Sequence, residues 1–199
     1  MATSAEKVAL AAERTKAGHL DRATWDRIVS ATGAVVAVVM IALGSVAVFG
    51  GMFGQDNVRD RLEPQKITFP PAEAMTPAET AEVGDFAGAY VDTGVEAEAF
   101  SRYIGLHLEE VNEGKTYSET SSAARAEGIS EDEAAELSGK ADTLFKGEAL
   151  RGNLLNAYGW WTVSTIALFT GIGLVAAGLL LAVFAFLGFR HSKKVSPDA

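Results

Sequence analysis

Two long runs without a charged residue constrain this chain of 199 residues more than any other feature. Residues 28–55 (IVSATGAVVAVVMIALGSVAVFGGMFGQ) and residues 152–189 (GNLLNAYGWWTVSTIALFTGIGLVAAGLLLAVFAFLGF) contain no Asp, Glu, Lys or Arg. A membrane-spanning helix needs about 20 apolar residues, and buried helices of soluble proteins rarely extend that far without a charge. The sequence therefore predicts an all-α membrane protein with two antiparallel transmembrane helices, over residues 28–53 and 154–189.

The first apolar run differs from a cleavable signal peptide. The preceding residues, 1–27, include four acidic side chains, and the run itself is longer than the apolar core of about 7–15 residues found in signal peptides. No clear small-residue cleavage signal follows it. We expect a retained membrane anchor.

The distribution of charge predicts the orientation. Residues 1–27 carry five Lys or Arg and residues 190–199 carry three, whereas residues 56–151 combine nine basic with 21 acidic side chains. Positive residues beside a membrane helix favour the cytoplasm. We therefore expect a multi-pass protein of the bacterial plasma membrane, with cytoplasmic tails at 1–27 and 190–199 and an acidic module at 54–153 outside. Trp25 is expected at the inner aromatic belt, and Tyr158, Trp160 and Trp161 at the outer one.

Composition excludes several kinds of site. The chain has no cysteine, so it has no disulfide, zinc–thiolate site, iron–sulfur cluster or thiol nucleophile. Its net charge of −9 argues against a nucleic-acid partner, because such proteins need a basic surface.

The outer module carries three signals for the start of a helix. Thr76-Pro77-Ala78-Glu79, Thr116-Tyr117-Ser118-Glu119 and Ser130-Glu131-Asp132-Glu133 each fit a capping box. The sequence predicts helices beginning near residues 77, 117 and 131, after extended chain over residues 65–71 (QKITFPP). A further helix is predicted from about 95 to 112, with Gly114 as its stop. The module is therefore expected to be helical throughout.

The stretch RYIGLHLEEVNEGKTYSE (102–119) resembles a metal site at first sight, because His107 is followed by Glu109, Glu110 and Glu113. On a helical wheel, His107 falls inside the apolar stripe formed by the following residues: Phe100, Tyr103, Ile104, Leu108 and Val111. Arg102 and Glu109 fall opposite. We expect a histidine buried or half-buried among apolar partners, with a weak, shared metal site as the alternative.

Catalytic chemistry lacks its usual residues here. A mononuclear iron site takes two histidines and a carboxylate, and catalytic zinc usually takes three ligands. His19 and His191 lie on the other side of the membrane in the expected topology, so His107 stands alone outside. No nucleophile elbow, phosphate loop, dinucleotide motif or calcium loop occurs. The sequence predicts no catalytic, cofactor-binding or metal-binding residue, no cofactor and no enzyme activity.

Small residues in the apolar runs suggest helix contacts. Ala47 and Gly51 are four residues apart, as are Gly173 and Ala177, and such faces let helices approach closely. We expect them to pack the two spans together. The expected partners are the lipid bilayer and either another integral membrane protein or a second copy of this chain.

Two further segments carry weaker predictions. Residues 4–17 fit an amphipathic helix in the N-terminal tail. In LFKGEALRGNLLNAYGWW (144–161), the favoured interpretation is that the outer helix runs into the second span and breaks or bends at Gly147 or Gly152. The alternative is a docking surface along the bilayer, formed by Leu144, Phe145, Leu150, Leu154 and Leu155, with Arg151 near lipid headgroups.

Three strings together resemble a family of two-span membrane proteins of actinobacteria. These are VRDRLEPQKITFPP, YIGLHLEEVNEGKTYSE and LFKGEALRGNLLNAYGWWTVSTIAL, and the similarity covers about residues 28–190. The family is often labelled aromatic ring-opening dioxygenase, LigA-like, and has no established biochemical role. The label implies an iron enzyme. The residues instead favour a structural or accessory subunit of the cell envelope, with the metal-dependent dioxygenase and an extracytoplasmic ligand or stress sensor as alternatives.

Overall fold

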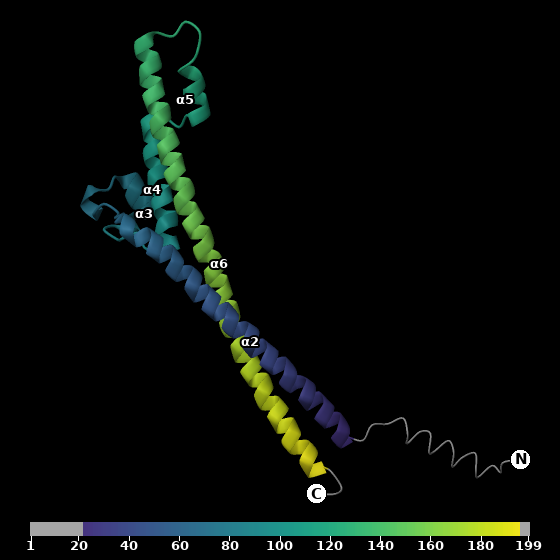
Figure 1. Ribbon diagram of the computed structural model, residues 1–199. Coiled ribbons are helices and arrows are strands. Elements are labelled where there is room, and N and C mark those ends of the chain that lie inside the picture. The colour runs from purple at the N-terminus through teal and green to yellow at the C-terminus, as the bar shows by residue number, and fades with distance from the viewer. Residues whose placement is uncertain (1–21, 196–199) are drawn as a thin grey trace, which may run out of the picture. The chain divides into compact units, whose positions relative to one another are not determined.

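The computed structural model describes residues 22–195, and every regular element within them is helical (Figure 1). The α-helices are α2 (Arg22–Leu62), α3 (Pro77–Val83), α4 (Gly94–Asn112), α5 (Tyr117–Ala123) and α6 (Glu131–Val195). Three short 3₁₀ turns cover Glu63–Gln65, Ala72–Ala74 and Gly84–Phe86. The predicted helical class is confirmed. The predicted helix at residues 4–17 lies outside the described residues.

Two of these helices, α2 and α6, are long and apolar enough to cross a membrane. By their contacts the described residues form two compact units. The first comprises residues 22–48 and 169–195, and the second comprises residues 49–168. Each unit is described by itself below.

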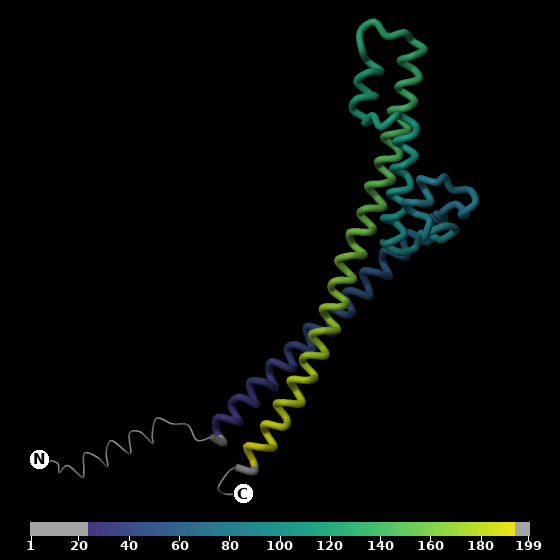
Figure 2. The backbone as a smooth tube through the Cα atoms, turned by 180° about the vertical axis from the view of Figure 1, so that it is seen from behind, coloured from purple at the N-terminus to yellow at the C-terminus, as the bar shows by residue number. Residues whose placement is uncertain are grey.

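In the first unit, α2 and α6 meet along a seam of small residues, and Figure 2 shows the two segments side by side. Its members are buried and recur every seven residues: Ser30, Ala37 and Gly44 on α2, and Gly171, Gly178, Ala185 and Ser192 on α6. A strict repeat of seven is the pattern of coiled-coil packing. We call these seven residues the small-residue seam.

Main-chain atoms make the closest contacts of the seam. A Cβ added at Gly171 would lie 2.6 Å from the Gly44 carbonyl oxygen, and one added at Gly44 would lie 2.8 Å from the Gly171 carbonyl oxygen. At Gly178 an added Cβ would lie 3.0 Å from the Ala37 carbonyl oxygen and 2.8 Å from the side-chain atom Ile41 Cγ1. Glycine is therefore required at these positions by close backbone approach.

The predicted spacing of four was wrong on α6. A Cβ at Gly173 would meet nothing within 4 Å, and Ala177 is exposed. The reason is that the two helices pack at period seven, so Gly171 and Gly178 face the neighbour instead. On α2 the prediction holds for Gly51, which belongs to the second unit, where an added Cβ would lie 2.6 Å from the Ser164 carbonyl oxygen.

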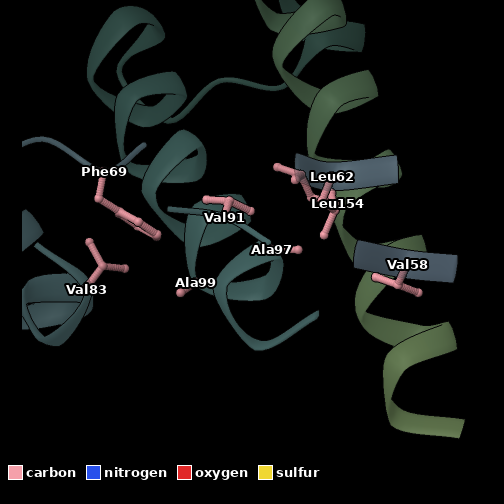
Figure 3. Close-up of a cluster of buried hydrophobic side chains, with 8 residues drawn as sticks. All are labelled: Val58, Leu62, Phe69, Val83, Val91, Ala97, Ala99 and Leu154. Atoms are coloured by element: carbon pink, nitrogen blue, oxygen red, sulfur yellow. The ribbon is translucent and has the colours of Figure 1, made fainter. Parts of the chain in front are cut away.

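The core of the second unit joins α3, α4 and the loop after α2 to the two long helices (Figure 3). Its buried apolar residues are Val58, Leu62, Phe69, Val83, Val91, Ala97, Ala99 and Leu154. Phe69 comes from the predicted extended segment, and its ring stands edge-on to Phe100 with the centroids 5.0 Å apart. The extended chain is held by an isolated antiparallel bridge between Thr68 and Tyr90.

The predicted helix starts are confirmed. Capping boxes begin α3 at Thr76 and α5 at Thr116, and the Ser130 hydroxyl accepts a hydrogen bond from Glu133 N–H (3.2 Å) at the start of α6. Helix α4 begins with a box that the sequence analysis missed. There, Glu96 accepts a hydrogen bond from the backbone N–H of Thr93 at 2.8 Å. The signal was present in the sequence as Thr93-Gly94-Val95-Glu96.

Helix α6 runs into the apolar segment as expected, and its helical hydrogen bonding continues through Gly147 and Gly152 without a break. Gly147 instead makes room for Leu108 of α4, which would lie 2.5 Å from an added Cβ. The guanidinium of Arg151 binds within the unit, donating to the Ser101 carbonyl oxygen (3.1 Å), and Trp161 packs against the core beneath Arg59.

Candidate functional site

His107 lies on α4 and pairs with Glu79 of α3. Its Nε2 is 3.3 Å from Glu79 Oε1, and its Nδ1 is 3.1 Å from the Tyr103 carbonyl oxygen. A neutral ring donates at one of these positions, and a protonated ring donates at both. The prediction of a buried or half-buried histidine among apolar partners was wrong. The His107 side chain is 47% exposed, and its main partner is the carboxylate of Glu79. The Tyr103 ring, 4.5 Å away, is the apolar contact that remains.

The position of Glu79 explains why a carboxylate meets this histidine. Glu79 is the third residue of α3, and its Oε2 accepts the backbone N–H of Thr76 at 2.7 Å to complete the capping box. Its second oxygen then points towards His107. The hydrogen bond from the Thr76 N–H, followed by the Thr76 hydroxyl and His107, lowers the pKa of Glu79 against the opposing effect of burial. The pair is thus an extension of a helix cap.

The three acidic residues that follow His107 do not join it. Glu109 and Glu110 are exposed on α4, and Glu113 ends that helix in the left-handed conformation with φ at 52°. No group of three or more His, Cys, Asp or Glu side chains suited to a metal ion occurs within residues 22–195. The residues present around His107 offer one imidazole and one carboxylate.

Arg102 provides the second link between α3 and α4. Its guanidinium contacts Glu82 at 2.8 Å and Glu98 at 3.1 Å, and the hydrogen bond to Glu82 raises its pKa. Val111 was wrongly placed in the apolar stripe and is exposed. Asn112 is buried in its place, and its amide donates to the Thr120 hydroxyl.

The second unit has a groove of about 1190 Å³ between the last turns of α2 and the middle of α6. Apolar residues line one end: Gly50, Phe53, Val163 and Ala167. The other end combines polar side chains (Asn57, Arg61, Gln65 and Asn153) with apolar ones (Val58, Leu62, Ile67, Leu150 and Leu154). Phe100 and Ile104 of α4 also line the groove. We call this hollow the interface groove.

Sequence reasoning missed the interface groove. The available signal was a set of amide and guanidinium side chains near the ends of the charge-free runs. Asn57 and Arg61 follow the first run, and Asn153 and Asn156 lie at the start of the second. Spacings of three and four residues put each pair on one helix face. The pairing of the two faces depends on the register of α2 against α6, which the sequence pattern did not reveal.

The chain matches no protein-family model, no curated protein and no solved structure. The functional argument therefore rests on its own residues.

Proposed function

We propose that the protein is a two-span, antiparallel membrane protein of the bacterial plasma membrane that serves as a non-catalytic structural or accessory subunit. One observation carries the proposal: along residues 22–48 and 169–195, small residues face the partner helix and large apolar residues face outward. Val35, Val38, Val46, Leu180 and Phe184 are each at least 55% exposed. In lipid such faces are solvated, whereas in water they would form an apolar surface of aggregating size.

Burial supports the proposal against a soluble alternative. The core helix of a soluble protein is mostly buried. In the most apolar 18-residue stretch of each long helix, by contrast, only 17% of α2 and 11% of α6 is buried inside the structure. The charge distribution, with the acidic residues concentrated between the two helices, supports cytoplasmic tails and an extracytoplasmic module at residues 54–153.

The acidic surface of the proposed extracytoplasmic module supports the accessory role. Its helices are fixed to one another by capping boxes, by the Arg102 ion pairs and by an aromatic core, so the acidic surface is held in one arrangement. A rigid charged surface on a membrane anchor suits recognition of another envelope component. Crosslinking in the native membrane, followed by mass spectrometry, tests this role: reproducible attachment to another protein supports it, and recovery of this chain alone contradicts it.

The topology has a direct test, because the chain has no cysteine and any introduced thiol is unique. Single-cysteine variants Ala5→Cys and Arg125→Cys are exposed to a membrane-impermeant maleimide in intact cells. We expect labelling at position 125 and none at position 5 until the cells are lysed. The reverse pattern would place the acidic module in the cytoplasm.

A further inference from the structure

The two ends of the interface groove differ in polarity, as the two ends of an amphiphile do. Along α2, Gly50 and Phe53 come before Arg61, and Gly50 and Arg61 are eleven residues apart, about 16 Å at the rise of an α-helix; Val58 and Leu62 also line the groove near Arg61. We propose that the groove binds one anionic phospholipid, with its headgroup at Arg61 and its acyl chains towards Ala167. The proposal rests on the membrane placement proposed above.

The charge at the polar end identifies the headgroup. Arg151 pairs with Glu148 at 2.7 Å and Arg59 lies over the Trp161 ring, whereas Arg61 makes no ion pair with an acidic side chain in the described part of the chain. Asp56 and Asp60, its neighbours on α2, are absent from the lining of the groove. A guanidinium flanked by amides donates several hydrogen bonds to a phosphate, which makes an anionic lipid the favoured occupant.

The position and size of the groove identify the tail. The first charge-free run ends at Gln55, and the second begins at Gly152. In the proposed topology the amides of Asn57 and Asn153 therefore lie at headgroup depth. Gly50 and Phe53 then lie at acyl-chain depth. Pockets for drug-sized ligands have volumes of roughly 300–1,000 Å³. The volume of about 1190 Å³ and the open side of the groove at Gly50, where an added Cβ meets nothing within 4 Å, suit a longer chain.

The test uses the full chain purified in a neutral detergent. Dioleoylphosphatidylglycerol or dioleoylphosphatidylcholine is added, and bound lipids are counted by native mass spectrometry. We expect one retained molecule of the anionic lipid and about tenfold weaker retention of the zwitterionic one, the ratio typical of a single charge-assisted contact. Arg61→Gln should reduce retention of the anionic lipid about tenfold.

Two matched controls separate the groove from general surface effects. Arg59→Gln removes the same charge two residues away, outside the lining, and should leave retention unchanged. Gly50→Leu fills the apolar end and should reduce retention of both lipids, whereas Gly159→Leu makes the same change at another open position outside the lining and should have no effect.

Three outcomes would overturn the proposal. Equal retention of the two lipids, or equal loss in Arg59→Gln and Arg61→Gln, would indicate general attraction of charged lipid to the surface. A dimer that carries no lipid and dissociates in Gly50→Leu would assign the groove to a second copy of this chain. Each result leaves the membrane placement standing if the protein still needs detergent for extraction, so the two failures are distinguishable.

Discussion

At the scale of single residues, the helices between the two long apolar segments begin with paired threonine and glutamate side chains. Glu79, Glu96 and Glu119 each accept a hydrogen bond from the backbone N–H of a threonine three residues earlier, and the first of them also meets His107. The stretch that resembles a metal site therefore has a simpler explanation. His107 pairs with Glu79, which belongs to the capping box of α3. The carboxylates that follow it, Glu109, Glu110 and Glu113, are exposed.

Acid should weaken the module through these carboxylates. Hydrogen bonds to the threonine N–H lower the pKa of Glu79 and Glu119, and Lys140 lowers that of Glu136, all from an ordinary value of 4.5. A lowered folded pKa contributes stability above the unfolded value, and this stability is lost as pH falls through the folded value. We expect the melting temperature in detergent to be constant near neutrality and to drop below pH 4.5.

Glu79→Gln tests this effect at one of the three carboxylates. The variant should melt below wild type at neutral pH and show a smaller further loss on acidification, because its capping group does not titrate. Glu109→Gln, at an exposed position of α4, is the control and should follow wild type. Parallel acid curves for wild type and Glu79→Gln would contradict the assignment.

Two non-glycine residues have left-handed backbone conformations, and replacing either with glycine should stabilise the protein. Lys66 ends the turn after α2 at φ 53°, and Glu113 ends α4 at φ 52°. Left-handed backbone costs an L-residue about 1–2 kcal/mol, partly offset by the entropy that glycine loses on folding, about 0.5–1 kcal/mol. We expect Glu113→Gly to stabilise the protein by up to about 1 kcal/mol in thermal unfolding. Glu109→Gly, inside α4, should instead destabilise it by about 1 kcal/mol, and a loss in both variants would refute the argument.

At the scale of helices, the small-residue seam is the feature most sensitive to substitution. Gly171→Ala places a methyl group 2.6 Å from the Gly44 carbonyl oxygen, so the helices must separate, which costs about 1–3 kcal/mol. Gly173→Ala adds the same methyl group into open space and should be neutral or slightly stabilising. Resistance to unfolding in increasing concentrations of sodium dodecyl sulfate measures both. Equal sensitivity of the two variants would show that the seam is misplaced.

Most helices could be predicted from sequence because their signals are local. Capping boxes at Thr76 and Thr116 and the absence of charge over residues 28–55 each depend on neighbouring residues alone. The seam was missed because spacings of four and of seven are both abundant in Gly-rich and Ala-rich segments. Choosing between Gly171 and Gly173 requires knowledge of which face meets the other helix. The same information decides that Trp161 packs in the core, where a side chain at Gly94 would collide with it.

At the scale of the whole molecule, the sequence indicated the arrangement of charge and apolar surface but not the interface groove, which two distant segments form together. Asn57 and Asn153 are separated by almost 100 residues, and nothing local links them. The position of His107 on a helix could be predicted, because helical periodicity is a local pattern. Its partner Glu79 could not be predicted, since it depends on how α3 docks on α4.

The alternative hypothesis of a metal-dependent dioxygenase makes a prediction that differs from our proposal. We expect purified protein to contain far less than one iron atom per chain, with the metal content unchanged in His107→Ala. Elemental analysis by mass spectrometry measures both. Stoichiometric iron that disappears in His107→Ala would revive the dioxygenase hypothesis and require ligands beyond Glu79, from a second copy of the chain.

The contact of Gly44 with Gly171 joins one peptide backbone to another, and this has a consequence for how such a sequence can vary. The exposed side chains of the same two helices, such as Val38 and Leu180, are not held in a close contact of this kind, so substitutions among Val, Ile, Leu and Phe should be tolerated there. In a saturating substitution library, intolerance should therefore recur at every seventh codon of both apolar segments, and that rhythm would reveal the helix pairing without any structure.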